Sequence, residues 1–151
     1  MRKAYENNLD ICLAHRSEYF KQVKAAAATQ RYFRWHVSGD IIDSAYLADM
    51  AAAARELPKT EFLCFTKQYE IVNEYISECG QLPENLHLIF SAWPGMTMDN
   101  RNNLPEAHVI FKGQEPADDW KVCGGNCTEC ACRGVGCWEL KKGEKIAFYE
   151  H

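Results

Sequence analysis

The first thirty residues carry the hydrophobic spacing of α-helices. Apolar side chains recur three and four positions apart in residues 5–13 and again in residues 19–27, so each segment has one apolar face. The polar run His15–Ser17 separates the two segments, and Ser17 is a residue type that often begins a helix. The pattern predicts two helices in a lead-in that spans residues 1–30.

Beyond this lead-in the pattern alternates between strands and helices. Arg31–Ser38 alternates apolar and polar side chains, Glu61–Thr66 is mostly apolar, and Leu86–Ala92 is nearly all apolar, as in a strand buried on both faces. Helical spacing fills residues 43–54 and 69–78 between these strands. A strand–helix–strand–helix–strand order predicts a parallel sheet joined by crossover helices.

Weaker signals extend the predicted sheet toward the C-terminus. A loop rich in proline and asparagine, residues 93–106, precedes a fourth predicted strand at Ala107–Lys112. Lys145–Tyr149 has the composition of a last short strand. The predicted fold class is α/β, with a small, mostly parallel sheet that is open or curved into a partial barrel and a C-terminal cysteine-rich metal-binding segment.

Length and composition place the chain among globular proteins. Its 151 residues fit a single domain, in which the lead-in is followed by an α/β core at 31–112 and a cysteine-rich tail at 120–151. A net charge of −4 gives no basic excess for binding nucleic acid through its phosphates. The chain shows neither an apolar run long enough to span a membrane nor a signal-peptide core. We therefore expect a cytoplasmic protein with no membrane partner.

The eight cysteines point to metal or redox chemistry, because disulfides are rare in a reducing cytoplasm. Three cysteines are scattered and are expected not to be ligands: Cys12, Cys64 and Cys79. The other five fall within fifteen residues of the tail. This clustering predicts one metal centre near the C-terminus.

The tail cysteines begin with the spacing C-x3-C-x2-C, and glycines between them allow the loop to curl around one centre. We expect Cys123, Cys127, Cys130 and Cys137 to be the ligands. Cys132 is the expected spare, because a strand-like pair with Cys130 would point the two sulfur atoms apart. One compact run favours an iron–sulfur cluster, a [4Fe–4S] centre first. Zinc is the alternative, and a group of small buried cysteines or disulfides without metal is a third interpretation.

The same C-x3-C-x2-C spacing is the signature of radical S-adenosylmethionine enzymes, in which it normally follows the first strand of a partial barrel. Here the cysteines follow the predicted core strands, so their position counts against a direct match. Two further cysteines in the tail could also close the iron that those enzymes keep open for their cofactor.

Polar side chains follow three of the predicted parallel strands, where α/β sheets place their ligands. His36 is predicted to share the polar face of its strand with Arg34. A small-molecule site at this edge would use six residues: Ser38, Asp40, Thr66, Lys67, Ser91 and Trp93. The alternative is that these are ordinary turn and cap residues. No catalytic triad or phosphate loop is visible, so the sequence names no catalytic residue.

Several of these segments also carry a family resemblance. The stretches Arg31–Asp40, Phe65–Lys67, Leu82–Leu86, Phe90–Trp93 and Cys123–Trp138 resemble, in matching order, the phage Gene product 88 domain family. The resemblance runs over nearly the whole chain. It implies a protein encoded by a phage or prophage that works in a bacterial host cell, and it implies no particular reaction.

Two functions follow as expectations. The first is a phage-type iron–sulfur protein, whose cluster is structural or redox-active, with a small-molecule pocket at the strand ends. The alternative is a zinc-stabilised module that catalyses nothing and binds a host or phage protein.

Overall fold

The computed structural model describes residues 2–36 and 38–150, and the mixed α/β architecture below refers to them. The helices are α1 (Arg2–Ala14), α2 (Arg16–Ala27), α3 (Ser44–Glu56), α4 (Tyr69–Cys79), α5 (Cys127–Arg133) and the 3₁₀ helix η1 (Gly136–Glu139). The strands are β1 (Tyr32–Arg34), β2 (Glu61–Thr66), β3 (Leu86–Ala92), β4 (Glu106–Ile110), β5 (Lys121–Val122) and β6 (Lys145–Tyr149).

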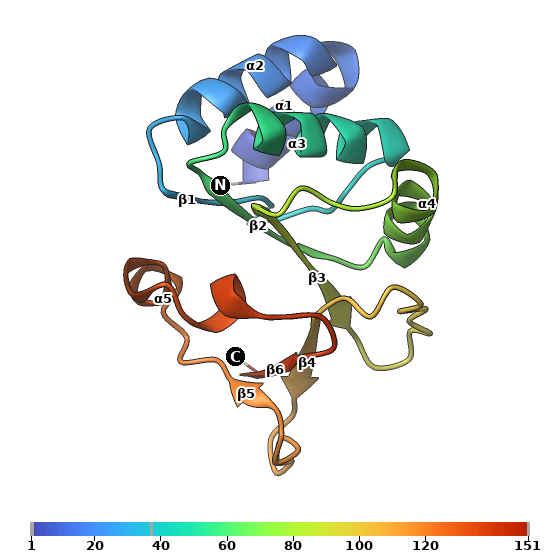
Figure 1. Cartoon of the computed structure of the whole chain (residues 1–151), viewed down its shortest axis with the longest axis vertical. Helices are drawn as coiled ribbons and strands as arrows, with labels where there is room; N and C mark the ends of the chain where they lie inside the picture. The colour runs from blue at the N-terminus through green and yellow to red at the C-terminus, as the bar shows by residue number, and fades with distance from the viewer. Residues whose placement is uncertain (1, 37, 151) are drawn as a thin grey trace.

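The six strands of the described chain form one sheet in the order β1-β2-β3-β4-β6-β5. Every neighbouring pair is parallel, and the sheet curves into a small half-barrel (Figure 1). The prediction of an α/β fold on a small parallel sheet is confirmed. The last strand along the chain, β6, lies between β4 and β5.

The two crossover helices begin and end where local chemistry requires. Asp43 caps α3, where its carboxylate accepts a hydrogen bond of 2.6 Å from the backbone N–H of Tyr46, as expected of a helix N-cap. α4 is followed by Gly80 at φ 89°, a conformation that favours glycine. These ends bear out the sequence prediction for both helices.

One face of the sheet is covered by α1 to α4 (Figure 1). Alternate strand residues such as Phe62, Cys64 and Phe90 are fully buried beneath these helices, together with Tyr46 from α3. Side chains alternate between the two faces of a strand, so the intervening residues point away from the helices. This larger core therefore belongs to the N-terminal two thirds of the chain.

The opposite face is covered by the cysteine-rich tail. Leu63, Ile89 and Ile146 from three strands pack there against Trp138 and Leu140. Fully burying an apolar side chain contributes about 1.5–3 kcal/mol, so these contacts fasten the tail to the sheet. Figure 1 shows α5 and η1 on the side of β2 away from α1 to α3.

Strand β1 is shorter than the sequence predicted. It ends at Arg34, although the N–H of Trp35 still donates to the carbonyl of Leu63 at 2.8 Å. His36 then takes a positive φ of 49°, which breaks the alternation. The His36 ring turns to the helix face and does not share a face with Arg34, so that expectation is wrong. Val37, also expected in this strand, lies outside the described residues.

Two local expectations in the helices and tail are also wrong, and one strand was not expected. Helix α2 begins at Arg16 with His15 at its N-cap, in place of Ser17. Strand β5 was not predicted, because two residues are too short to show a period. The region around Cys130 is helical, not strand-like.

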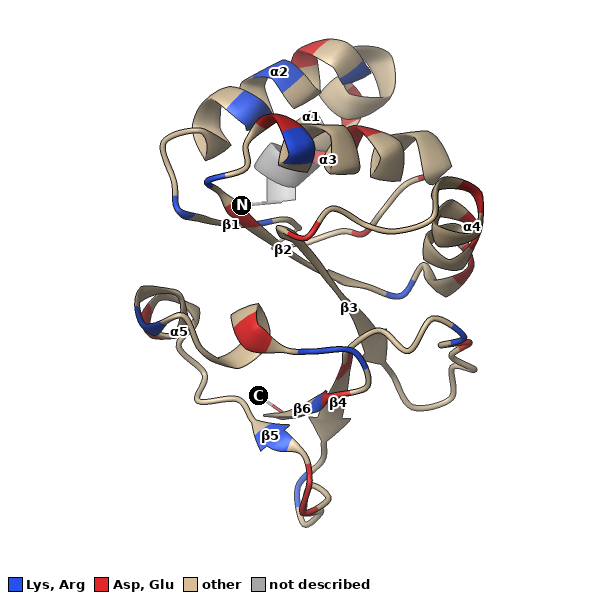
Figure 2. Cartoon of the chain, viewed as in Figure 1, with Lys and Arg blue, Asp and Glu red and all other residues tan. Residues whose placement is uncertain are grey.

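Charged side chains of both signs are spread over the helices and loops (Figure 2). The solvent side of α4 is acidic, with exposed Glu70, Glu74 and Glu78. Among the described residues, none of the helices has the length and apolar character needed to cross a membrane.

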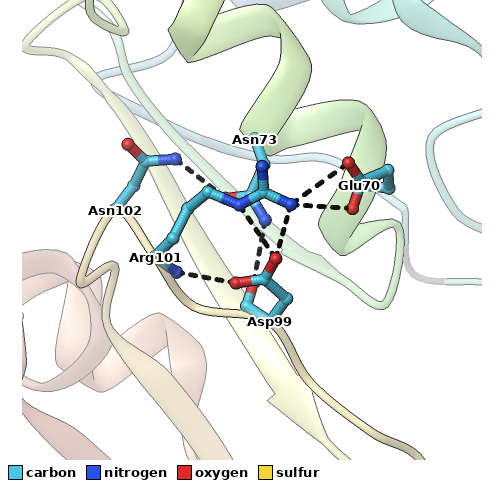
Figure 3. Close-up of polar contacts among 5 residues, drawn as sticks. All are labelled: Glu70, Asn73, Asp99, Arg101 and Asn102. Atoms are coloured by element: carbon cyan, nitrogen blue, oxygen red, sulfur yellow. Dashed lines mark hydrogen bonds and ion pairs between the residues drawn. The ribbon is translucent and has the colours of Figure 1, made fainter.

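Strands β3 and β4 are connected by a loop that contains no helix, and this loop is held against α4 by polar contacts (Figure 3). Asn73, which is 1% exposed, donates through Nδ2 to the Asp99 carbonyl at 2.8 Å and accepts from Asn102 Nδ2 at 2.8 Å. On the outside of the loop, Arg101 Nη2 reaches Glu70 at 3.2 Å. A buried amide and an exposed ion pair thus hold the same loop.

Replacing Asn73 with alanine leaves the Asp99 carbonyl and the Asn102 amide without these partners. We expect the free energy of unfolding to fall by about 1–3 kcal/mol, because a buried polar group without a hydrogen-bond partner has given up its bonds to water and gained none in return. The matched control Arg101→Ala removes two exposed ion pairs, with Glu70 and Asp99, and should cost much less. Urea denaturation of both variants measures this, and a greater loss from Arg101→Ala would contradict the assignment.

Candidate metal centre

Four tail cysteines line one small cavity of about 40 Å³ between the tail and the sheet. Cys123 follows β5, Cys127 and Cys130 lie on α5, and Cys137 lies in η1. Apolar side chains from the strands and η1 complete the lining: Leu63, Val122, Trp138 and Ile146. The four expected ligands therefore converge, although they come from three separate elements.

Helix α5 decides which sulfur atoms face the cavity. Asn126 caps the helix by accepting from the N–H of Glu129 at 3.1 Å. Cys127 and Cys130 are three positions apart and lie on one face, whereas Cys132 is turned about 200° from Cys130 at 100° per residue. Cys132 is exposed and is not among the residues that line the cavity. Its separation has a helical cause, not the strand-like cause that the sequence suggested.

Glycines let the backbone approach the sulfur atoms closely. At Gly136, with φ 71°, a Cβ atom would lie 3.2 Å from the sulfur of Cys130. At Gly125, with φ 77°, the backbone N–H donates to the sulfur of Cys123 at 3.4 Å. Any larger residue at Gly136 would press against a candidate ligand.

The centre also contains a cation from the first strand. Arg34 Nη1 donates to the sulfur of Cys127 at 3.4 Å. Burial raises the pKa of Cys137 to about 12; three other thiols also raise it and Arg34 opposes them. Those three thiols belong to Cys123, Cys127 and Cys130. The other three sulfur atoms are therefore close enough to act electrostatically on the sulfur of Cys137.

The other three cysteines lie apart from this cavity. Cys12 and Cys64 are buried in the core beneath the helices, and Cys79 is exposed at the end of α4. Burial raises the pKa of Cys64, whose sulfur contacts Nδ1 of His36 at 3.4 Å. Burial also lowers the pKa of His36. A buried cysteine of this kind behaves as a small hydrophobic residue.

Within the described residues, no group of three or more histidine, cysteine or acidic side chains is arranged to hold a metal ion. A tetrahedral zinc site holds its four sulfur atoms about 2.3 Å from one ion. In a four-iron cluster each thiolate binds a different iron, so the sulfur atoms surround a larger centre. Four cysteines around one cavity have the donor chemistry that such a cluster needs.

The six strand-end residues divide into two groups. Lys67, Ser91 and Trp93 line another cavity, of about 220 Å³, at the carboxyl ends of the strands. The ammonium of Lys67 lies 5.4 Å from the centre of the Trp93 ring. The other three are not among the residues that line this cavity: Ser38, Asp40 and Thr66.

Asp40 and Thr66 bond to each other. The Asp40 carboxylate accepts from Oγ1 of Thr66 at 2.5 Å, from the N–H of Lys67 at 2.8 Å and from the N–H of Ile41 at 2.7 Å. Thr66 is 1% exposed. Ser38 lies in an exposed bend. These hydrogen bonds hold the chain that follows β1 against the end of β2, so Asp40 has a structural role.

Sequence reasoning missed the role of Arg34 at the centre. Arg34 and Cys127 are 93 positions apart, and no local pattern joins them. The available signal was that Arg34 is a cation on the polar face of a predicted strand that ends at the ligand-binding edge.

Replacing Asp40 with alanine removes three hydrogen bonds at the end of β2. We expect the free energy of unfolding to fall by about 1–3 kcal/mol, because the buried Thr66 hydroxyl loses its partner. Asp118→Ala, in the exposed linker before β5, is the matched control and should change little. Chemical denaturation checks this, and an unchanged Asp40→Ala stability would return Asp40 to the candidate ligand-binding residues.

Comparison with known proteins bears on the origin of the chain. No curated protein and no solved structure matches it significantly. The model of one family, described as Gene product 88, matches residues 1–145, a range that includes strands β1 to β5, both crossover helices and all five tail cysteines. The chain therefore belongs to the bacteriophage Gene product 88 family.

Proposed function

We propose that this protein binds a [4Fe–4S] cluster through Cys123, Cys127, Cys130 and Cys137. The observation that carries the proposal is that these four cysteines line one cavity while Cys132 is exposed outside it. Cluster irons take thiolate ligands at comparable sequence spacings. A reducing compartment keeps such thiols available, and we place the protein in the cytoplasm of the bacterial host.

The surroundings of the cysteines suit charged sulfur ligands. The N–H of Gly125 and the guanidinium of Arg34 each donate to a cysteine sulfur. Hydrogen bonds to ligand sulfurs stabilise their negative charge and set the reduction potential of a cluster. Because Gly136 has no side chain, the loop can pass close to the sulfur of Cys130 and fold around the centre.

Zinc is the second candidate, because four thiolates also make a structural zinc site. A zinc-bound form would be a non-catalytic module that binds a host or phage protein. One observation favours the cluster: the cysteines form one compact run in the sequence, without a second, well-separated pair. Metal content distinguishes the two.

A cluster at this position would serve structure, electron transfer or both. It would join β5, α5 and η1, which have two, seven and four residues. Elements of this length are not stable alone. All four thiolates would be occupied, so no iron would be left open for a substrate, and Arg34 would supply a positive charge beside Cys127.

The ligand assignment is tested by single cysteine-to-serine substitutions in protein purified without oxygen. Replacement of Cys123, Cys127, Cys130 or Cys137 should remove most of the iron and the broad visible absorbance of the cluster. The matched control Cys132→Ser should retain both, because its sulfur lies outside the cavity. Iron and zinc are measured per chain, and circular dichroism shows whether each variant folds. One zinc per chain without iron would overturn the cluster in favour of zinc.

The role of Arg34 is tested through the reduction potential. Reduction adds a negative charge to the cluster, and a nearby cation stabilises that charge. We therefore expect Arg34→Gln to shift the potential to a more negative value in a potentiometric titration. Arg55→Gln is the control, because Arg55 lies on α3, on the other face of the sheet. An equal shift in both variants, or none in Arg34→Gln, would contradict the assignment.

A further inference from the structure

The cavity at the carboxyl ends of the strands opens on the same face of the sheet as the cysteine centre. Its volume is about 220 Å³. Four strands or the residues just after them contribute Arg34, Phe65, Lys67, Trp93 and Phe148 to its walls. In a parallel sheet these ends lie at one edge, where α/β folds place their ligands.

Aromatic rings form much of the wall. Phe65 and Phe148 meet edge to face at 5.7 Å between ring centres, and the Trp93 indole, which is 48% exposed, lines the same cavity. Exposed aromatic surface on a cavity wall offers a flat molecule a stacking partner. The shape and chemistry of the walls favour a planar ring.

Two cations face this aromatic cavity. The guanidinium carbon of Arg34 lies 5.1 Å from the centre of the Phe65 ring, and Lys67 lies over Trp93. Among the described residues, neither cation has a carboxylate partner, whereas Lys24 pairs with Glu56 at 2.7 Å. Cations without a carboxylate partner beside a partly apolar wall attract anions.

We propose that this cavity binds a small planar anion, namely an aromatic or heteroaromatic ring that carries a carboxylate or a phosphate. The ring stacks against Trp93 and the two phenylalanines, and the anionic group reaches Lys67 and Arg34. This site extends the proposed function, because Arg34 also donates to Cys127. Its walls come from the sheet, so the site does not require the cluster.

The test uses 2-naphthoate as the anionic probe and the neutral 2-naphthamide as its matched control, by isothermal titration calorimetry. We expect naphthoate to bind about tenfold or more tightly than naphthamide, a difference of the size that one lost charge contact gives. Its affinity should fall as salt screens the cations. Absence of naphthoate binding, or equal affinity for both probes, would overturn the proposal.

Two variants locate the binding site. Lys67→Met keeps the aliphatic stem and removes the charge, and Trp93→Leu removes the ring. Each should weaken naphthoate binding about tenfold, while Lys59→Met, at the amino end of β2, should leave it unchanged. Melting temperatures confirm that each variant is folded. Unchanged binding in both cavity variants would show that the probe binds elsewhere and would overturn the site.

Iron content measured on the same samples separates the two proposals. A colourless, folded protein that binds naphthoate through Lys67 would overturn the cluster and keep the anion site. A brown protein that does not bind naphthoate would keep the cluster and overturn the anion site.

Discussion

The handedness of parallel crossovers decides where the chemistry of this protein lies. The connections from β1 to β2 and from β2 to β3 step across the sheet in one direction. The connection from β5 to β6 steps in the opposite direction, because β6 lies between β4 and β5. A right-handed crossover then places α3 and α4 on one face and the α5–η1 segment on the other. For this reason the four converging cysteines share a face with the strand-end cavity and are separated by the sheet from Cys64 and the helical core.

The tail depends on that second face for its own order. Its helical elements are short, and short helices are marginal without tertiary packing. Trp138, 9% exposed, supplies such packing against Tyr32, with ring centres 4.9 Å apart. Trp138 directly follows Cys137, so the residue that anchors the tail also positions a candidate ligand. Burial of Trp138 and binding of a metal centre would stabilise the same local structure.

Arg34 links the cysteine centre to the strand-end cavity, because its side chain contacts Cys127 and also lines that cavity. A single guanidinium between two sites means that a charge arriving at one changes the electrostatic environment of the other. Lys67 has no comparable contact with a cysteine sulfur among the described residues. The two cations of the cavity therefore differ in role: Lys67 serves the cavity, and Arg34 serves both sites.

The sequence by itself determined the order of strands and helices as far as β4, the parallel sheet and the cysteine run, because these depend on periodicity, turn residues and spacing within short windows. It identified β2 and β3 with their observed bounds and set Cys132 apart from its neighbours, although for the wrong local reason. Only the tertiary structure decided that Asp40 pairs with Thr66, that His36 turns to the helices and that Arg34 meets Cys127. Those contacts join residues ten to 93 positions apart, and they follow from strand register and crossover handedness, which no local pattern encodes.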